Sequence, residues 1–209
     1  MNIVVFGPPG VGKGTASEIL SKKLHIPKIS TGDVLREEMD NETEIGKKVK
    51  EIVNSGNLVP DEMIIEIFKE RISAPAFTRG FITDGFPRTV KQAEALDKIG
   101  KIDHVFNMIA THDSLLERLT GRRLCTNCGS SFNVNISLFT PKKENICDKC
   151  GADLEARKDQ EPKVVENRLK VYDSQTKPVL DYYKKKKILY DIDAEGTPEE
   201  IVNQIQEIL

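Results

Sequence analysis

The chain has 209 residues, and its 31 basic side chains nearly balance 33 acidic ones, which gives a net charge of −2. This length accommodates one α/β domain with insertions or two small domains. The balanced charge excludes the strongly basic surface of a protein that coats nucleic acid. No stretch reaches the roughly 18 apolar residues of a membrane-spanning helix, and the N-terminus lacks a secretory pattern. We therefore expect a soluble, cytoplasmic protein that binds neither nucleic acid nor membrane.

Short apolar runs alternate with helical patterns along the chain. Strands are predicted at residues 3–6, 80–83, 104–109 and 188–192. Helices are predicted at residues 16–24, 33–39, 44–55, 61–72, 90–99, 113–119, 162–185 and 198–209. This alternation predicts a parallel sheet covered by helices on both faces. Thr89, Thr111 and Thr197 each precede a helical pattern, where a threonine side chain can accept hydrogen bonds from the first turn.

The most informative segment is Gly-Pro-Pro-Gly-Val-Gly-Lys-Gly-Thr at residues 7–15, between the first strand and the first helix. Its glycines allow successive backbone N–H groups to turn toward one anion. The helix N-terminus adds a partial positive charge, and Lys13 adds a full one. The motif departs from the general phosphate loop because Gly14 follows Lys13, and the hydroxyl comes one place later, at Thr15. The context favours a nucleotide-phosphate site over an ordinary glycine-rich turn.

A second candidate phosphate group follows the strand predicted at 80–83. Asp84 stands at the carboxyl end of this strand, which lies beside the phosphate loop in a doubly wound sheet. Its carboxylate is suited to holding Mg²⁺, directly or through water. Arg88 follows four residues later and can bind two phosphate oxygens at once. The alternative is that Asp84 is only a turn or helix-capping acid.

Residues 124–157 lack helical periodicity and contain all four cysteines, as Cys125-x-x-Cys128 and Cys147-x-x-Cys150. A glycine after each pair permits a tight turn that points two thiolates at one ion. Four such sulfurs suit a structural zinc site, although iron would bind the same ligands. Disulfides are unfavoured in a cytosolic chain, and a redox pair would need only one such motif. We predict a small metal-stabilised lobe inserted into the α/β domain.

Arginines flank this insert on both sides: Arg118, Arg122 and Arg123 lead into it, and Arg157 and Arg168 lead out of it. Any one surface arginine is usually without a specific role. Their position at both ends of a stiffened lobe suggests a lid that brings cations onto a reacting phosphate and excludes water. Phosphoryl transfer is accelerated mainly by positioning and by neutralisation of charge, so several cations around one phosphate make chemical sense.

These segments resemble the adenylate kinases over essentially the whole chain. The resemblance rests on the loop at 7–15, Ser-Thr-Gly-Asp-Val-Leu-Arg at 30–36, Gly-Asn-Leu-Val-Pro-Asp at 56–61, Asp-Gly-Phe-Pro-Arg-Thr-x-x-Gln-Ala at 84–93 and Arg-Leu-Thr-Gly-Arg-Arg at 118–123. The Gly14-Thr15 ending is typical of this family, and the four-cysteine insert is similar to the zinc-bearing lid of its long form.

The resemblance implies a P-loop three-layer α/β/α fold with a central parallel sheet, a small helical AMP-binding insert and a zinc-bearing β lid. It places the core at 1–29, 60–121 and 158–209, the AMP-binding part at 30–59 and the lid at 122–157. The implied reaction is ATP + AMP ⇌ 2 ADP in a monomer, with Mg²⁺ on ATP, which serves adenine nucleotide homeostasis.

The resemblance also implies the site residues. ATP would contact Gly10, Val11, Gly12, Lys13, Gly14, Thr15, Arg118, Arg122, Ser131, Phe132 and Pro198. AMP would contact Thr31, Arg36, Asn57, Leu58, Val59, Gly85, Phe86, Pro87, Arg88, Gln92, Arg157 and Arg168. The catalytic set would be Lys13, Asp84, Arg88, Arg122, Arg157 and Arg168, and the metal ligands Cys125, Cys128, Cys147 and Cys150.

One departure from the family lies after Arg157, where Asp159 is kept but Gln160 replaces a second acid. This puts in doubt any role that needs both carboxylates. A rival hypothesis is a kinase for CMP, UMP or GMP, against which Thr31, Gln92 and the long lid favour AMP. A nucleotide-dependent switch with a zinc docking module would not need a second, acceptor pocket. Against a structural zinc protein with a vestigial loop stands the joint presence of Lys13, Asp84 and Arg88.

Overall fold

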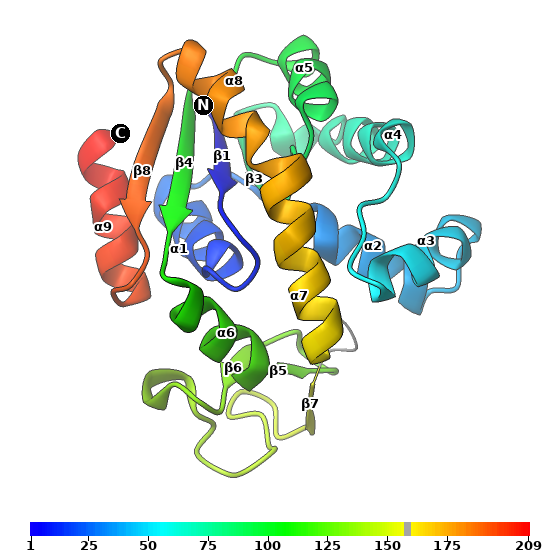
Figure 1. Ribbon diagram of the computed structural model, residues 1–209, viewed down its shortest axis with the longest axis vertical. Coiled ribbons are helices and arrows are strands. Elements are labelled where there is room, and N and C mark those ends of the chain that lie inside the picture. Colours follow the sequence, from blue (N-terminus) through cyan, green and yellow to red (C-terminus); the bar gives the residue numbers. More distant parts are fainter. Residues whose placement is uncertain (157–159) are drawn as a thin grey trace.

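The structure, a computed structural model, describes residues 1–156 and 160–209. Within these residues, five parallel strands form a central sheet in the order β2-β3-β1-β4-β8. Helices surround this sheet (Figure 1), and a small antiparallel sheet β6-β5-β7 lies beyond the carboxyl ends of its strands. The central strands are β1 (Asn2–Phe6), β2 (Lys28–Ser30), β3 (Phe81–Asp84), β4 (His104–Ile109) and β8 (Leu189–Asp193). The small sheet comprises β5 (Arg122–Cys125), β6 (Ser131–Asn133) and β7 (Leu154–Glu155).

Successive residues of β1 point to opposite faces of the sheet. Ile3 and Val5 belong to one buried cluster, in which α1 and α9 pack together. Val4 and Phe6 belong to the other cluster, with residues of α2, α3, α4, α5 and α8. Because both faces are buried, β1 is continuously apolar, as expected for a central parallel strand. The helices are α1 (Lys13–Leu24), α2 (Thr31–Asp40), α3 (Glu44–Asn54), α4 (Asp61–Ile72), α5 (Val90–Ile99), α6 (His112–Gly121), α7 (Pro162–Val171), α8 (Pro178–Lys185) and α9 (Pro198–Ile208).

The predicted fold class is confirmed, and most elements lie within a few residues of their predicted bounds. The strand at 104–109 and the helices at 61–72 and 90–99 agree with prediction at both ends. Thr89, Thr111 and Thr197 each accept a hydrogen bond from a backbone N–H of the following helix. The prediction missed β2, which has three residues and begins with a lysine, so it carries little apolar pattern.

The single helix predicted at 162–185 is wrong. The chain instead forms α7, a π-helical turn over Tyr172–Thr176, and then α8. The N–H of Lys177 donates to the carbonyl of Tyr172 at 2.8 Å, one residue further back than in an α-helix. Pro178 has no N–H and its ring would clash with the carbonyl four residues earlier, which accounts for the irregular turn.

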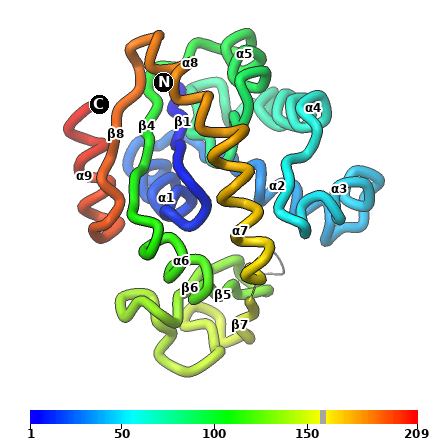
Figure 2. Tube along the Cα trace, in the orientation of Figure 1, coloured from blue at the N-terminus to red at the C-terminus, as the bar shows by residue number. Residues whose placement is uncertain are grey.

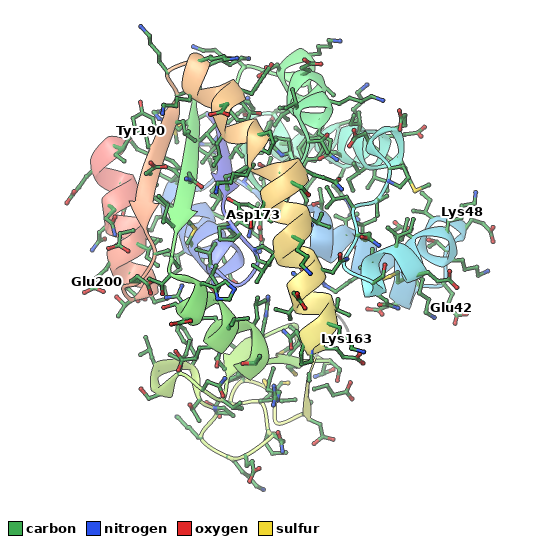
Figure 3. The ribbon with its side chains drawn as sticks, in the orientation of Figure 1. Glu42, Lys48, Lys163, Asp173, Tyr190 and Glu200 are labelled. Atoms are coloured by element: carbon green, nitrogen blue, oxygen red, sulfur yellow. The ribbon has the colours of Figure 1, made fainter. Side chains whose placement is uncertain are left out.

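The segment after β1, the α2–α3 pair and helix α7 lie around the carboxyl edge of the central sheet (Figure 2). In Figure 2, the segment after β1 curves toward α7, and α2 and α3 extend to one side. Charged side chains such as Glu42 and Lys48 point outward from this α2–α3 pair, whereas Lys163 marks the end of α7 next to the small sheet (Figure 3).

In the part of the chain that the structure describes, no helix is long and apolar enough to cross a membrane.

Candidate active site

The loop between β1 and α1 has the backbone conformation of a phosphate cradle. Gly10 and Gly12 have φ values of +88° and +103°, a region that side chains other than glycine rarely adopt. A Cβ atom at Gly10 would lie 2.7 Å from Leu119 of α6, so the loop also has no room there. Helix α1 begins at Lys13, three residues before its predicted start, and its N-terminus therefore faces the loop directly.

The side chain of Lys13 forms hydrogen bonds with the loop that precedes it. Its Nζ donates to the carbonyl oxygens of Gly7 at 2.9 Å and Pro8 at 2.8 Å. Burial lowers the pKa of Lys13 from its ordinary value of 10.5 to about 7, although Asp84 acts in the opposite direction. Nearby arginines lower this pKa further, in the order Arg88, Arg168 and Arg122. The structure therefore gathers the predicted cations around one lysine that gains from any anion bound there.

Gly14 stands where the general phosphate loop has serine or threonine. A Cβ atom at this position would lie 3.3 Å from Oδ2 of Asp84. Strands β1 and β3 pair in parallel with Val5 opposite Asp84, which brings the end of β3 against the start of α1. The glycine thus gives the Asp84 carboxylate space next to the cradle, at a position where it could hold a cation bound to phosphate.

Gly85 is the point at which two predicted acceptor-side residues meet. Both Oγ1 of Thr31 and Nε of Arg88 donate to its carbonyl oxygen, each at 2.8 Å. Gly85 has φ +78°, and a Cβ atom there would lie 2.9 Å from Nη2 of Arg88. Glycine is therefore required both by the backbone and by the close approach of the guanidinium.

A pocket of about 60 Å³ lies between these segments. Its volume is enough for a few water molecules. Predicted site residues that line it are Lys13, Leu58, Gly85, Phe86, Pro87, Arg88 and Arg168. Lining residues outside the predicted site set are Val5, Phe6, Gly7, Pro9, Gly56, Val171, Tyr172 and Thr176.

Tyr172 was missed although a signal for it exists. Its ring lies 6.1 Å from that of Phe6, at the end of β1. It follows Arg168 by four residues, and residues at this spacing share one face of a helix. The same face of α7 should therefore have been expected to line the pocket that Arg168 enters.

Three further acceptor-side residues, Arg36, Val59 and Asn57, are each held by different neighbours. Arg36 pairs with Asp33; burial alone would raise the pKa of Asp33, but Arg36 and Lys28 outweigh it and hold this pKa below its usual value. Val59 is buried in the larger hydrophobic cluster. Asn57 accepts a hydrogen bond at 3.1 Å from Asn167 of α7, which joins the loop after α3 to the helix that carries Arg168.

The predicted ATP residues outside the loop come from four elements: α6, β5, β6 and α9. Arg118 of α6 donates to the carbonyl oxygens of Val11 at 3.1 Å and Ala194 at 2.7 Å, so it ties the phosphate loop to the segment between β8 and α9. Pro198 is the first residue of α9. Nε of Arg122 donates to Oγ of Ser131 at 3.1 Å.

Two further predictions concern the small lobe. Phe132 packs against the buried cysteines of this lobe, Cys125 and Cys147. Arg157 and Asp159 lie outside the described residues, so the predicted role of Arg157 stays a prediction. Gln160, which replaces the second acid, is buried.

The four cysteine sulfurs lie within 4.8 Å of one another. The two motifs share one backbone pattern: the glycine N–H of each donates to the carbonyl of its first cysteine, at 3.0 Å for Cys125 and 2.9 Å for Cys147. Gly129 and Gly151 have φ values of +69° and +75°, as the tight turns require. The four sulfurs are close enough to coordinate one tetrahedral metal ion at about 2.3 Å each.

The sequence model of the adenylate kinases matches residues 5–188. An adenylate kinase of Caldicellulosiruptor bescii is 50% identical, and the alignment covers 100% of this chain and 97% of that protein. The chain belongs to the adenylate kinase family. An adenylate kinase of Archaeoglobus fulgidus is 47% identical over 100% of this chain and 98% of its own length, and one of Methanocella arvoryzae is 46% identical over 99% and 97%.

Membership of the adenylate kinase family accounts for the geometry around Lys13 and Gly85. The two segments that the resemblance assigned to different nucleotides meet here, through the pairing of β1 with β3. The predicted donor and acceptor sites thus face one another across the pocket lined by Lys13 and Arg88.

We predict that Lys13 makes the stability of the nucleotide-free protein depend on pH. Between pH 7 and 10.5 the unfolded chain binds more protons at Lys13 than the folded one, so the free energy of unfolding rises with pH over this window. Lys13→Met removes this contribution. Urea unfolding of both proteins from pH 6.5 to 9.5 should show the wild type gaining stability relative to the variant as pH rises; a constant difference would contradict the lowered pKa.

We predict that Cys128→Ser lowers the melting temperature far more than it lowers activity at low temperature, because a metal held by the four cysteines would stabilise the lobe and not the reacting groups. Chelation of the wild type should have the same effect. Ser137→Ala, an exposed change in the same lobe, serves as the control and should leave both unchanged. Equal loss of activity at every temperature would instead indicate a catalytic metal.

Proposed function

We propose that this chain catalyses the reversible transfer of a phosphoryl group from MgATP to AMP, which yields two ADP. One observation carries the proposal: the phosphate loop with Lys13 and the acceptor segment with Arg88 line a single pocket. Membership of the adenylate kinase family over residues 5–188 supports the same conclusion.

The chemistry that these residues can perform is positioning and charge neutralisation. The N–H groups of residues 10–15 would bind the ATP phosphates, and Lys13 would be fully protonated against them, because a polyanion raises its pKa. Mg²⁺ bound with ATP would neutralise charge on the phosphates, and Asp84 is the carboxylate placed to hold it. No general base is needed, because the attacking group is a phosphate oxygen of AMP that is already anionic.

Arginines would complete the neutralisation of the transferred group. Arg88 and Arg168 line the pocket, and Arg122 is close enough to lower the pKa of Lys13. Together with Arg157, these arginines would surround the phosphoryl group during transfer. Fixed cations in a water-poor site stabilise such a transition state strongly. On the acceptor side, Thr31, Arg36, the segment 57–59 and Gln92 would hold AMP.

The domain boundaries stay part of the proposal: a core of 1–29, 60–121 and 158–209, an AMP-binding part of 30–59 and a lid of 122–157. Asn167 donates to the carbonyl of Ser55 at 2.9 Å and to Asn57, so the AMP-binding part is closed against α7 here. Release of these contacts would open the small pocket to a nucleotide. We further propose a monomer in the cytoplasm that binds ATP, AMP and ADP.

We assign zinc to the four cysteines, in a structural role. Four thiolates without an open coordination position suit a structural Zn²⁺ better than a catalytic ion. Iron would fit the same sulfurs. Metal analysis of protein expressed with both metals present should find one equivalent of zinc per chain, and one equivalent of iron would reverse the assignment.

The proposed reaction is tested by measuring phosphoryl transfer from MgATP to AMP, CMP, UMP and GMP separately. Rapid formation of ADP with AMP and slow transfer to the others is the expected result. Preference for another monophosphate would leave the assigned fold and reaction type unchanged, and would assign the acceptor specificity to that base. The absence of transfer to all of them, from folded and metal-loaded protein, would contradict the proposal.

We predict that Arg88→Ala lowers kcat at least about a hundredfold, because it removes charge stabilisation at the transferred group. Arg79→Ala is the matched control. Arg79 is exposed and lies just before β3, at the opposite end of that strand from Asp84, so its loss should leave kcat unchanged. Steady-state kinetics with saturating MgATP and AMP decide the matter, and near-normal turnover of the Arg88 variant would remove Arg88 from the catalytic set.

A further inference from the structure

Asp61, the first residue of α4, connects that helix to the start of α5. Its Oδ1 accepts a hydrogen bond from Nε2 of Gln92 at 2.7 Å and another from Oγ1 of Thr89 at 2.9 Å. Oε1 of Gln92 in turn accepts a hydrogen bond from the backbone N–H of Arg88 at 2.7 Å. Gln92 is only 2% exposed, so these bonds form where water cannot easily replace them.

The two contacts to Gln92 fix the direction of its amide because they require opposite chemistry. A carboxylate can only accept hydrogen bonds, so the amide group that faces Asp61 must be the NH₂. A backbone N–H can only donate, so the group that faces Arg88 must be the oxygen. Rotation of the amide by 180° would replace both attractive contacts with repulsive ones. Without Asp61, the bond to Arg88 would be the only side-chain hydrogen bond of Gln92, among residues 1–156 and 160–209, to oppose this rotation.

The position of Asp61 suits this task. It lies in the first turn of α4, where the partial positive charge of a helix N-terminus favours a carboxylate. The Thr89 hydroxyl holds the same carboxylate oxygen from a second direction. The next residue, Glu62, is exposed and pairs with Lys91 on the surface instead. The two neighbouring acids therefore differ in surroundings, and only Asp61 reaches Gln92.

The fixed amide keeps a defined set of free hydrogen-bonding groups. An amide side chain offers two N–H groups and two lone pairs. Among the described residues, Asp61 uses one N–H and Arg88 uses one lone pair, which leaves one of each for a ligand. One donor beside one acceptor is the set with which glutamine binds the edge of adenine, whose amino group donates beside a ring nitrogen that accepts. Guanine and hypoxanthine carry an oxygen in place of that amino group. This base oxygen would face the amide oxygen of Gln92, so two acceptors would meet.

We propose that Asp61 is a positioning residue that makes the acceptor site select adenine, by fixing the orientation of Gln92. The inference rests on the proposed function, since it requires that the acceptor is a nucleoside monophosphate whose base meets Gln92. Asp61 touches no reacting atom in this account. Its loss should therefore change the binding and choice of the acceptor base, and leave the use of ATP and the rate of transfer at saturation nearly unchanged.

The test is steady-state kinetics of Asp61→Leu, Asp61→Asn and Glu62→Gln with MgATP and either AMP or IMP as acceptor. Asp61→Leu has similar size but no acceptor, and should raise KM for AMP about tenfold, the usual effect of losing one buried hydrogen bond. It should also lower the preference for AMP over IMP in kcat/KM, while kcat and KM for ATP stay within about twofold of wild type. Glu62→Gln, the matched control, should behave as wild type throughout.

Asp61→Asn separates the orienting role from a merely structural one. Its amide oxygen can still accept from Gln92, so KM for AMP should recover most of the loss seen with leucine. Its own NH₂ group also tolerates a rotated Gln92, so the preference for AMP over IMP should stay below that of wild type. This variant decides the matter if Asp61→Leu fails to fold, which thermal unfolding would show.

Two results would overturn the inference: an unchanged preference for AMP over IMP in the folded Asp61 variants, or a loss of kcat accompanied by an equal rise in KM for ATP. In either case a wild type that transfers phosphate to AMP would leave the proposed function standing. A wild type that transfers phosphate to no monophosphate would instead contradict the proposed function itself.

Discussion

The free energy lost when the ammonium group of Lys13 is buried is the constraint on which the site depends. Within the described residues, this group donates hydrogen bonds to two carbonyl oxygens of its own loop, and burial lowers its pKa to about 7. Arginines nearby add to the unfavourable charge, and Asp84 offsets part of it. A bound polyphosphate would place negative charge next to this ammonium group and the arginines at once. It would thereby offset the cost of burying the Lys13 charge.

The sheet supplies the geometry that this arrangement needs. Because β1 pairs with β3 in parallel, the loop that carries Lys13 and the segment from Asp84 to Arg88 leave the same edge of the sheet next to each other. Small residues then allow close approach, with Gly14 beside the Asp84 carboxylate and Gly85 beside the Arg88 guanidinium. The α7 helix brings Arg168 to the same pocket and bonds to the loop after α3 through Asn167. In the four-cysteine lobe, the four sulfurs lie within 4.8 Å of one another, where a metal ion would cross-link the lobe.

Local patterns were sufficient to predict the features that lie within one segment. The loop at 7–15, the acid after β3 and the spacing of the cysteines each carry their chemistry in adjacent residues, and the structure brings the predicted groups together. The π-helical turn before Pro178 was not predicted, because one proline in a long helical pattern does not say how the helix accommodates it. Asp61 was missed because it contacts Gln92, which is distant in the sequence. Such contacts appear only when the tertiary packing is known.

The measurement that tests the central claim most directly is proton uptake on binding of MgATP at pH 8, by calorimetry in buffers with different heats of ionisation. Lys13 with a pKa near 7 is mostly neutral at this pH in the free protein, and the bound phosphates should return it to the charged form. The wild type should take up close to one proton per bound nucleotide, and Lys13→Met should take up none if it still binds. Binding to the wild type without proton uptake, or with the same uptake as in the variant, would contradict a neutral Lys13 in the free protein.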